Sequence, residues 1–312
     1  MAKYLITGGA GFIGSNLAEE LLKEKNEIRI LDNFSSGKME NIVPFSKDIE
    51  LIKGDIRNIE DVEEVVEGVD FVVHLAAVAS VAKSVEDPEG TNKVNIDGTT
   101  NILKASSGSK VKKVIFASSC AVYGDIGREK ARENMEPHPL SPYAKAKLKG
   151  EELCKEFSQK DGLPSVSLRL FNVFGPNQDP TSDYSAVIPK FITKMLKGEK
   201  TVIFGDGKQS RDFVYIGNVT KAIIAACNSD FMKGEVINIA SGENHDLLEL
   251  VKILKELLGT ELDPVFEGAR EGDIKFSKAN INKALQMLKY EPSIDLKEGL
   301  ERTIRYYKGT RI

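Results

Sequence analysis

The stretch Thr7-Gly8-Gly9-Ala10-Gly11-Phe12-Ile13-Gly14 decides the fold that we predict for this chain. It follows the apolar run Tyr4-Leu5-Ile6, which is typical of a strand, and residues 15–22 after it show the apolar period of a helix. Glycines in the turn allow positive φ and let a pyrophosphate approach the backbone, and the N–H groups at the helix N-terminus attract that anion. The stretch therefore predicts a strand–turn–helix unit that binds a dinucleotide.

Asp32 supports this interpretation because it ends the next strand-like run, residues 28–31. A carboxylate about 20 positions after such glycines accepts hydrogen bonds from the ribose hydroxyls of NAD. The alternative is that Asp32 only ends a strand at a turn. Since no arginine directly follows it and a carboxylate repels a 2′-phosphate, we expect NAD rather than NADP, although the nearby Lys38 leaves NADP open.

The composition narrows the class of protein. A chain of 312 residues can form one or two domains, and its net charge of −4 argues against a nucleic-acid surface. No run of about 18 apolar residues predicts a membrane span, and the N-terminus enters a strand without a signal peptide. The three cysteines are scattered and the three histidines unpaired, so we expect a cytoplasmic protein without a metal site.

Strand-like and helix-like segments alternate through the first half of the chain. This alternation is typical of right-handed βαβ units and predicts an α/β fold, a Rossmann-type doubly wound parallel sheet. The predicted strands are residues 3–7, 27–31, 49–53, 71–75, 113–118 and 165–170, with helices at 59–67 and 94–105.

Ligands of such sheets bind beyond the carboxyl ends of the strands, so the residues after each strand are candidate cofactor contacts. Asp55 is one of them, and we weigh a bond to the adenine amine equally with a simple turn. The full set of predicted cofactor residues is Gly8, Gly11, Phe12, Ile13, Gly14, Asp32, Asn33, Ser35, Ser36, Gly37, Asp55, Ile56, Leu75, Ala76, Ala77, Asn95, Tyr143 and Lys147.

The pattern changes after Leu170, where residues 171–176 and the following polar stretch predict a long loop. We expect residues 1–170 to form the NAD-binding domain and residues 171–312 a smaller α/β substrate domain, with a return to the first domain near 212–240. The elements predicted in this part are helices at 187–196, 246–258 and 296–307 and strands at 201–204 and 235–239.

The segment Ser141-Pro142-Tyr143-Ala144-Lys145-Ala146-Lys147 predicts a helix, because serine is a good N-cap and proline suits the first helical position. Tyr143 and Lys147 then lie on one face, four residues apart. A lysine ammonium and an oxidised nicotinamide would lower the pKa of the phenol toward neutrality, making Tyr143 a general base. Taken alone, Tyr143 and Lys147 would be interpreted as an ordinary surface pair. Because the same chain carries the dinucleotide-binding glycines, we favour a catalytic role for them. Ser119, after a predicted strand, could bond the same substrate oxygen.

Three motifs together resemble the extended short-chain dehydrogenase/reductase superfamily, and within it the UDP-glucose (UDP-galactose) 4-epimerases. They are the glycine stretch, Ser118-Ser119-Cys120-Ala121-Val122-Tyr123-Gly124, and Tyr143 with Lys147. The similarity continues through residues 168–176, 205–215 and 270–274, which point to nucleotide sugars. It implies a homodimer that holds NAD tightly, with Tyr143 as base, Lys147 as its partner and Ser119 as helper.

The resemblance also implies a mechanism and a substrate site. C4 of a UDP-sugar is oxidised, the 4-keto sugar rotates, and hydride returns to the opposite face. By this resemblance, Asn172 would contact the diphosphate, and Arg211 and Arg270 would clamp it. The residues that we predict to bind substrate are Lys83, Ser119, Tyr143, Asn172, Val187, Arg211, Arg270 and Ser277.

Several alternatives bear on the substrate. Dehydratases of this superfamily carry an Asp-Glu pair where this chain has Cys120 and Ala121, which argues against dehydration. A UDP-glucuronate 4-epimerase or decarboxylase stays open, with Lys83-Ser84 as a grip for the carboxylate. In the related epimerases a small residue at the position of Ser277 leaves room for an N-acetyl group, so we expect UDP-GlcNAc and UDP-GalNAc to be accepted as well. A non-catalytic NAD-sensing protein is disfavoured because Tyr143, Lys147 and Ser119 are all present.

Overall fold

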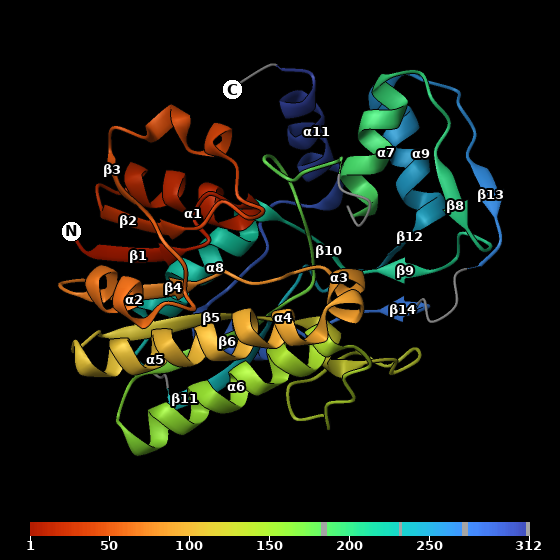
Figure 1. Cartoon of the computed structure of the whole chain (residues 1–312). Helices are drawn as coiled ribbons and strands as arrows, with labels where there is room; N and C mark the ends of the chain where they lie inside the picture. The colour runs from red at the N-terminus through yellow and green to blue at the C-terminus, as the bar shows by residue number, and fades with distance from the viewer. Residues whose placement is uncertain (182–185, 231–232, 270–273, 310–312) are drawn as a thin grey trace.

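Seven parallel strands form the central sheet of the protein (Figure 1). The computed structural model describes residues 1–181, 186–230, 233–269 and 274–309. The strand order is β11-β6-β5-β4-β1-β2-β3, the doubly wound arrangement expected from the sequence. The strands are β1 (Lys3–Thr7), β2 (Glu27–Asp32), β3 (Ile49–Lys53), β4 (Phe71–His74), β5 (Lys113–Ser119), β6 (Ser165–Leu170) and β11 (Lys233–Ile239).

Helices cover both faces of this sheet, which explains why its central strands are apolar on both sides. Helices α1 (Phe12–Lys23) and α8 (Ile216–Asn228) pack against each other on one face. Helices α2 (Ile59–Val66), α5 (Gly98–Gly108) and α6 (Pro142–Lys160) pack together on the other. Each face buries its own apolar core, so the predicted Rossmann-type fold is confirmed.

The stretch between β1 and α1 folds as a tight strand–turn–helix unit. Gly8 N donates to Leu31 O at the end of β2, and Gly11 N turns back to Gly8 O at 3.1 Å. Gly11 is the N-cap of α1, and no side chain caps the helix. The N-terminus of α1 therefore points past the carboxyl edge of the sheet with its first N–H groups available for a ligand.

The helix predicted at 94–105 differs in its first turn. Residues Lys93–Asp97 form a π-turn (η3), and the α-helix proper begins at Gly98. Two short helices missed from the sequence precede it, α3 (Val81–Glu86) and α4 (Pro88–Asn92). Asp87 caps α4 and Pro88 occupies its first turn, so local capping rather than apolar period determines these helices.

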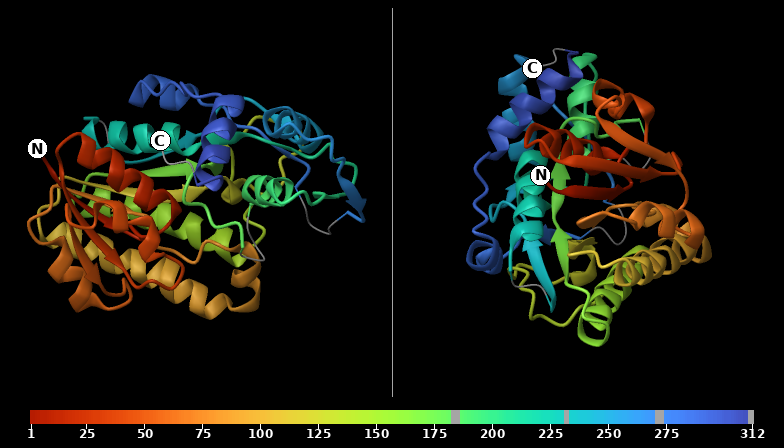
Figure 2. Two further views of the ribbon diagram at one scale, coloured as in Figure 1. Left: turned by 90° about the horizontal axis from the view of Figure 1, so that it is seen from above. Right: turned by 90° about the vertical axis from the view of Figure 1, so that its left-hand side faces the viewer.

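A smaller unit lies beyond the carboxyl ends of the strands, where Figures 1 and 2 show α7 and α9 beside β8 and β13. Residues 171–176, predicted as loop, contain the short strand β7, which pairs with β10. Helix α8, which the sequence did not reveal, precedes β11 in the main sheet. The remaining elements are β7 (Asn172–Phe174), α7 (Val187–Leu196), β8 (Val202–Phe204), β9 (Ser210–Arg211), β10 (Phe213–Tyr215), β12 (His245–Asp246), α9 (Leu247–Leu258), β13 (Val265–Glu267), β14 (Phe276–Ser277), α10 (Asn282–Leu288), α11 (Leu296–Tyr307) and the short turns η1 (Met39–Asn41), η2 (Val43–Phe45) and η4 (Cys120–Tyr123).

In the described part of the chain, no helix combines the length and the apolar character that crossing a bilayer requires.

Candidate active site

A cavity of about 530 Å³ runs along the carboxyl ends of the sheet strands. Its wall is formed by the glycine turn, the ends of β2 and β4, the first turn of α6 and the loop after β7. Every residue predicted to bind the cofactor lines it except Asp55 and Asn95. The cavity therefore lies where a doubly wound sheet binds its ligand.

The glycine turn is packed too tightly for side chains. Gly8 has φ +72°, and a Cβ on it would lie 2.8 Å from the backbone nitrogen of Ala76. A Cβ on Gly14 would lie 2.4 Å from the carbonyl oxygen of Gly8. These two glycines let β1, the turn and α1 approach one another, and so bring backbone N–H groups to the cavity wall.

Asp32 lies at the end of β2 and is only 7% exposed. Its Oδ2 accepts from Ala10 N at 2.9 Å and its Oδ1 from Phe34 N at 2.8 Å. Each carboxylate oxygen has a second lone pair, so the side chain can still accept from the two hydroxyls of a ribose. Asp32 can therefore both end the strand at a turn and bind a ligand, because the backbone donors orient its carboxylate.

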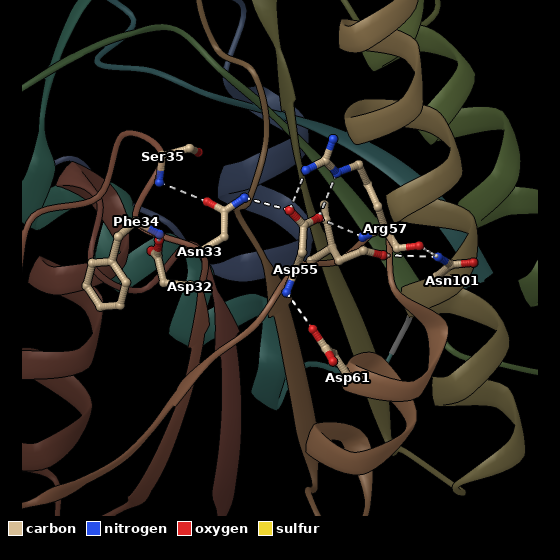
Figure 3. Close-up of polar contacts among 9 residues, drawn as sticks. Asp32, Asn33, Phe34, Ser35, Asp55, Arg57, Asp61 and Asn101 are labelled. Carbon is tan, nitrogen blue, oxygen red and sulfur yellow. Dashed lines mark hydrogen bonds and ion pairs between the residues drawn. The ribbon is translucent and has the colours of Figure 1, made fainter.

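Neighbouring side chains hold the carboxylate of Asp55 (Figure 3). The Arg57 guanidinium clamps its carboxylate through Nε and Nη2 at 2.9 and 2.7 Å, and Asn33 Nδ2 donates to it at 2.8 Å. The charged Arg57 holds the pKa of Asp55 well below its usual range. Asp55 therefore joins the ends of β2 and β3 at the rim, and its neighbour Ile56 lines the cavity instead.

The amide of Asn95 is hydrogen bonded inside the protein. The side chain is buried, its Oδ1 accepts from Val78 N at 2.8 Å, and its Nδ2 donates to Val78 O at 3.0 Å. Val78 lines the cavity and Asn95 does not. Asn95 thus shapes the wall from behind rather than contacting a ligand directly.

The three predicted catalytic residues meet at one end of the cavity. Ser119 ends β5, and Tyr143 and Lys147 share one face of α6, which begins as expected with Ser141 as its N-cap. Lys147 Nζ donates to Ala117 O at 2.7 Å and lies 5.9 Å from the centre of the Tyr143 ring. The Ser119 hydroxyl is hydrogen bonded to the phenol.

Burial dominates the electrostatics of this group. It raises the pKa of Tyr143 to about 12, although the hydrogen bond from Ser119 opposes the shift. Burial also lowers the pKa of Lys147 to about 8, against the charge of Glu151. The groups of the protein alone thus leave the phenol pKa raised. The lowering that we expect requires the oxidised nicotinamide as well as Lys147.

A second cavity, of about 240 Å³, adjoins the first at Phe171, which lines both. Asn172, Arg211 and Ser277, three of the residues predicted to bind substrate, line it together. They come from β7, β9 and β14, elements far apart in the sequence. The tertiary fold thus brings an amide, a guanidinium and a small hydroxyl together in one cavity, next to the cavity of the glycine turn.

The carboxylate of Asp212, fully buried, holds this second cavity together. Its Oδ1 accepts from the backbone and the hydroxyl of Ser241 at 2.8 and 2.7 Å. Its Oδ2 accepts from Gly242 N and Ala279 N, and its backbone oxygen accepts from Asn172 Nδ2. Asp212 therefore fastens two segments around the cavity through its side chain and a third through its backbone oxygen. Nothing in the sequence indicated this role beyond its place next to Arg211.

The remaining predicted substrate residues are not brought into either cavity. Lys83 is exposed on α3, and Val187 is partly buried in the first turn of α7. Neither lines a cavity described above. Arg270 lies outside the described residues. The hydroxyl of Ser84 is also engaged, since it donates to Val81 O and accepts from Tyr143 N at 3.1 Å.

An ion pair that the sequence did not predict spans the mouth of the first cavity. Lys38 Nζ, in the loop after β2, lies 2.7 Å from Asp179 Oδ2, in the loop after β7, and both residues line the cavity. The lysine that left NADP open is thus partnered by a carboxylate. No local pattern links residues 38 and 179, so only the fold reveals the pair.

The first cavity suits a dinucleotide on three observations of its own chemistry. The uncapped N-terminus of α1 faces a space that any side chain at Gly14 would disrupt. Asp32 presents a buried, oriented carboxylate. Gln178 has a buried Oε1 with no partner in the described chain, beside the same cavity. Donors for a pyrophosphate and acceptors for hydroxyl and amide groups are thus all present.

Comparison with known proteins extends these observations. The model of the NAD dependent epimerase/dehydratase family matches residues 4–240. A putative UDP-glucose 4-epimerase of Methanocaldococcus jannaschii is 40% identical over 307 residues, or 98% of each chain. The structure of a UDP-N-acetylglucosamine 4-epimerase from Methanobrevibacter ruminantium M1, in complex with UDP-N-acetylmuramic acid, superposes with a TM-score of 0.95 at 41% identity, covering 99% of both chains. A UDP-glucuronic acid 4-epimerase from Bacillus cereus, in complex with UDP-glucuronic acid and NAD, gives a TM-score of 0.90 at 34% identity and covers 99% of this chain and 100% of that one.

Proposed function

The chain belongs to the NAD dependent epimerase/dehydratase family, and from this premise we propose that it is a UDP-hexose 4-epimerase with tightly bound NAD. Its substrates would be UDP-glucose and UDP-galactose, together with UDP-GlcNAc and UDP-GalNAc. The observation that carries the proposal is the place of Tyr143. It lines the cavity of the glycine turn together with Ser119 and Lys147, and Cys120, the residue after Ser119, lines the cavity of Arg211 and Asn172.

When bound, NAD supplies a reversible hydride acceptor, and its oxidised ring adds the positive charge that the phenol lacks. Gly8, Gly14 and Asp32 would hold the dinucleotide through backbone donors and a carboxylate. Tyr143 would take the proton of the sugar 4-hydroxyl and give it back to the same oxygen once C4 has the opposite configuration. Lys147 stabilises the phenolate, because its ammonium lies one helical turn away over the ring.

The substrate side of the site would hold the sugar by its diphosphate. The Arg211 guanidinium and the Asn172 amide provide charge and hydrogen bonds suited to phosphate oxygens. Ser119 would donate to the C4 oxygen from the end of β5. Because these groups act on the phosphates and one oxygen, the rest of the sugar ring is left free to turn over.

Elimination of water is disfavoured by the side chain that follows Ser119. Burial raises the pKa of the Cys120 thiol to about 11, so the thiol stays protonated at neutral pH. Ala121 has no titratable group. Neither residue can shuttle the protons that dehydration requires.

Ser277 supports the proposal that acetamido sugars are accepted. It lines the second cavity beside Cys120 and Arg211, where its small side chain leaves space. A Ser277→Tyr variant should lose activity on UDP-GlcNAc while it keeps activity on UDP-glucose. Equal loss of both activities, or no change in either, would refute the role of this position.

Uronic acid substrates are the second candidate, since a relative acts on UDP-glucuronic acid. The grip that we expected from Lys83 and Ser84 is disfavoured, because Ser84 is engaged and Lys83 is exposed outside the cavities. The deciding experiment incubates the purified protein, without added NAD, with UDP-glucose, UDP-GlcNAc and UDP-glucuronic acid, and resolves the epimers by NMR. A product that is only a pentose or a 4-keto-6-deoxy sugar would overturn the proposal.

Two features of organisation also belong to the proposal. Residues 1–170, with the return segment 212–240, would bind NAD, and residues 171–312 would bind the UDP-sugar. We further propose a homodimer that packs α5 and α6 against the same helices of a second copy, as the resemblance implies. Sedimentation of the purified protein tests the dimer.

A further inference from the structure

Beneath the catalytic side chains, a row of buried polar groups crosses three strands of the sheet. Ser118 of β5, Arg169 of β6 and Asn238 of β11 are direct neighbours in register, so their side chains share one face. Glu151 of α6 reaches this face, and Nε and Nη2 of Arg169 donate to its two carboxylate oxygens at 2.8 and 2.7 Å. Ser118 Oγ donates to the same carboxylate.

Burial makes this ion pair unusual. The side chains of Arg169 and Glu151 are only 3% and 5% exposed. Removing two charges from water is costly, and apolar residues of similar volume are often as stable in their place. The presence of the pair is therefore poorly explained by stability alone.

The pair fastens the catalytic helix to the catalytic strand. Lys147 Nζ donates to Ala117 O, and one helical turn later Glu151 accepts from the next residue of β5, Ser118. The residue after that is Ser119. Two consecutive positions of β5 are thus fixed to α6 directly before the predicted catalytic serine, so the contact sets the distance between Ser119 and Lys147.

The charges around Lys147 also link it to Glu151. Its ammonium is buried, which lowers its pKa to about 8, and the carboxylate of Glu151 opposes this shift. Cys154 on α6 and His74 on β4 also face it. Burial keeps both uncharged near neutral pH, because it raises the pKa of the thiol to about 12 and lowers that of the imidazole to about 3. Glu151 therefore supplies negative charge next to Lys147, with Arg169 on the far side of the carboxylate.

We propose that Glu151, held by Arg169 and Ser118, is a positioning residue of the epimerisation site. It keeps Lys147 charged beneath Tyr143 and holds the Ser119 end of β5 in place against α6. This inference rests on the proposed function of Tyr143, Lys147 and Ser119.

The consequence concerns how Tyr143 and Lys147 share their protons. The productive form has a phenolate and an ammonium, and the unproductive form of equal charge has a neutral phenol and a neutral amine. Removing the charge of Glu151 favours the second form and lowers the pH at which the pair loses its last proton. On the alkaline side of the pH profile, activity should therefore begin to fall at a lower pH than in the wild type.

The test compares the holoenzyme of the wild type with Glu151→Gln and with the apolar double variant Glu151→Leu/Arg169→Met. The matched control is Glu152→Gln, because Glu152 is exposed on the same helix and pairs with the exposed Lys149 at 3.0 Å. We expect the alkaline limb of the kcat profile to move down by about one pH unit. At pH 8 kcat should fall about tenfold, while KM changes less than about twofold. Glu152→Gln should match the wild type.

A second readout needs no substrate. The ultraviolet absorption of the Tyr143 phenolate, taken as the difference from Tyr143→Phe, should decrease at neutral pH in both Glu151 variants. If the wild type converts no UDP-sugar but this decrease is found, the proposed function fails and the positioning role stands.

A folded double variant with wild-type NAD content, pH profile and phenolate signal would overturn the inference, because the pair would then be structural only. Should both Glu151 variants fail to fold, Ser118→Ala removes one hydrogen bond without leaving a charge unpaired. It should move the alkaline limb in the same direction by a smaller amount. An unchanged profile in Ser118→Ala would then overturn the inference.

Discussion

The two cavities that share Phe171 are built in different ways. The wall of the larger one is mostly backbone and small residues at the ends of parallel strands, closed by contacts such as Gly14 against Gly8. The smaller one is made of side chains from β7, β9 and β14, and the carboxylate of Asp212 fastens the segments around it. The first cavity should therefore be sensitive to added atoms, and the second to lost hydrogen bonds.

The strongest test of this division is Tyr143→Phe, which removes the proton acceptor from the larger cavity and changes no other atom of either wall. We expect kcat to fall about 10³-fold, because positioned acid–base groups contribute effects of this order. NAD content and KM should stay near the wild type, as measured by absorbance after denaturation and by steady-state kinetics. The control is Tyr306→Phe, since Tyr306 is exposed on α11. More than a tenth of wild-type turnover in Tyr143→Phe would show that another group moves the proton.

Gly14→Ala should damage the larger cavity alone. A Cβ at Gly14 would lie 2.4 Å from Gly8 O and 2.6 Å from the Cα of Gly9, so the turn must open. Overpacking of this kind weakens NAD binding about 100-fold. Equilibrium dialysis measures it, with Gly108→Ala as control because no atom lies within 4 Å of a Cβ there. Wild-type NAD affinity in Gly14→Ala would contradict the proposed seat of the pyrophosphate.

Asp212→Asn should damage the smaller cavity alone. An amide nitrogen would replace one of the oxygens that accept from Ser241, Gly242 and Ala279, leaving backbone donors unpaired. KM for the UDP-sugar should rise about tenfold while NAD content is unchanged. Asp125→Asn is the control, because Asp125 is exposed and only closes a local turn with Gly127. Loss of NAD together with a raised KM would mean that the two cavities are not independent.

The same difference explains what the sequence could predict. The strand ends and the glycine turn follow from apolar period and spacing, so nearly all predicted cofactor residues line the larger cavity. Asp55 and Asn95 do not line this cavity, because Arg57 and Val78 engage their side chains and compete with a ligand for them. Such competition depends on side-chain geometry that no spacing encodes.

On the substrate side, prediction depended on the resemblance rather than on the residues. Asn172, Arg211 and Ser277 lie together only because three short strands fold onto one another. The Glu151–Arg169 pair joins residues 18 positions apart on a helix and a strand, and each looks like an ordinary charged residue in the sequence. Long-range contacts of this kind have no local signal, which is why the sequence left them unassigned.

The smallest expected effect concerns the ion pair that spans the mouth of the larger cavity, Lys38 with Asp179. Both side chains are partly exposed, at 47% and 35%, so solvent screens the pair and Asp179→Asn should raise the rate of NAD release only about threefold. Because the pKa of Asp179 is lowered to about 2, its charge stabilises the folded protein above its unfolded value of about 3.9. That contribution is lost as the pH falls from about 4 towards 2. Asp179 stays charged between about pH 5 and 9, so NAD retention should not change over that range. Exchange of bound NAD, measured at low and at high salt, should show the difference between variant and wild type shrink with salt.

The control is Glu256→Gln, which breaks the exposed pair with Lys297. A release rate that changes equally in both variants would mean that the Lys38–Asp179 contact does not retain the cofactor.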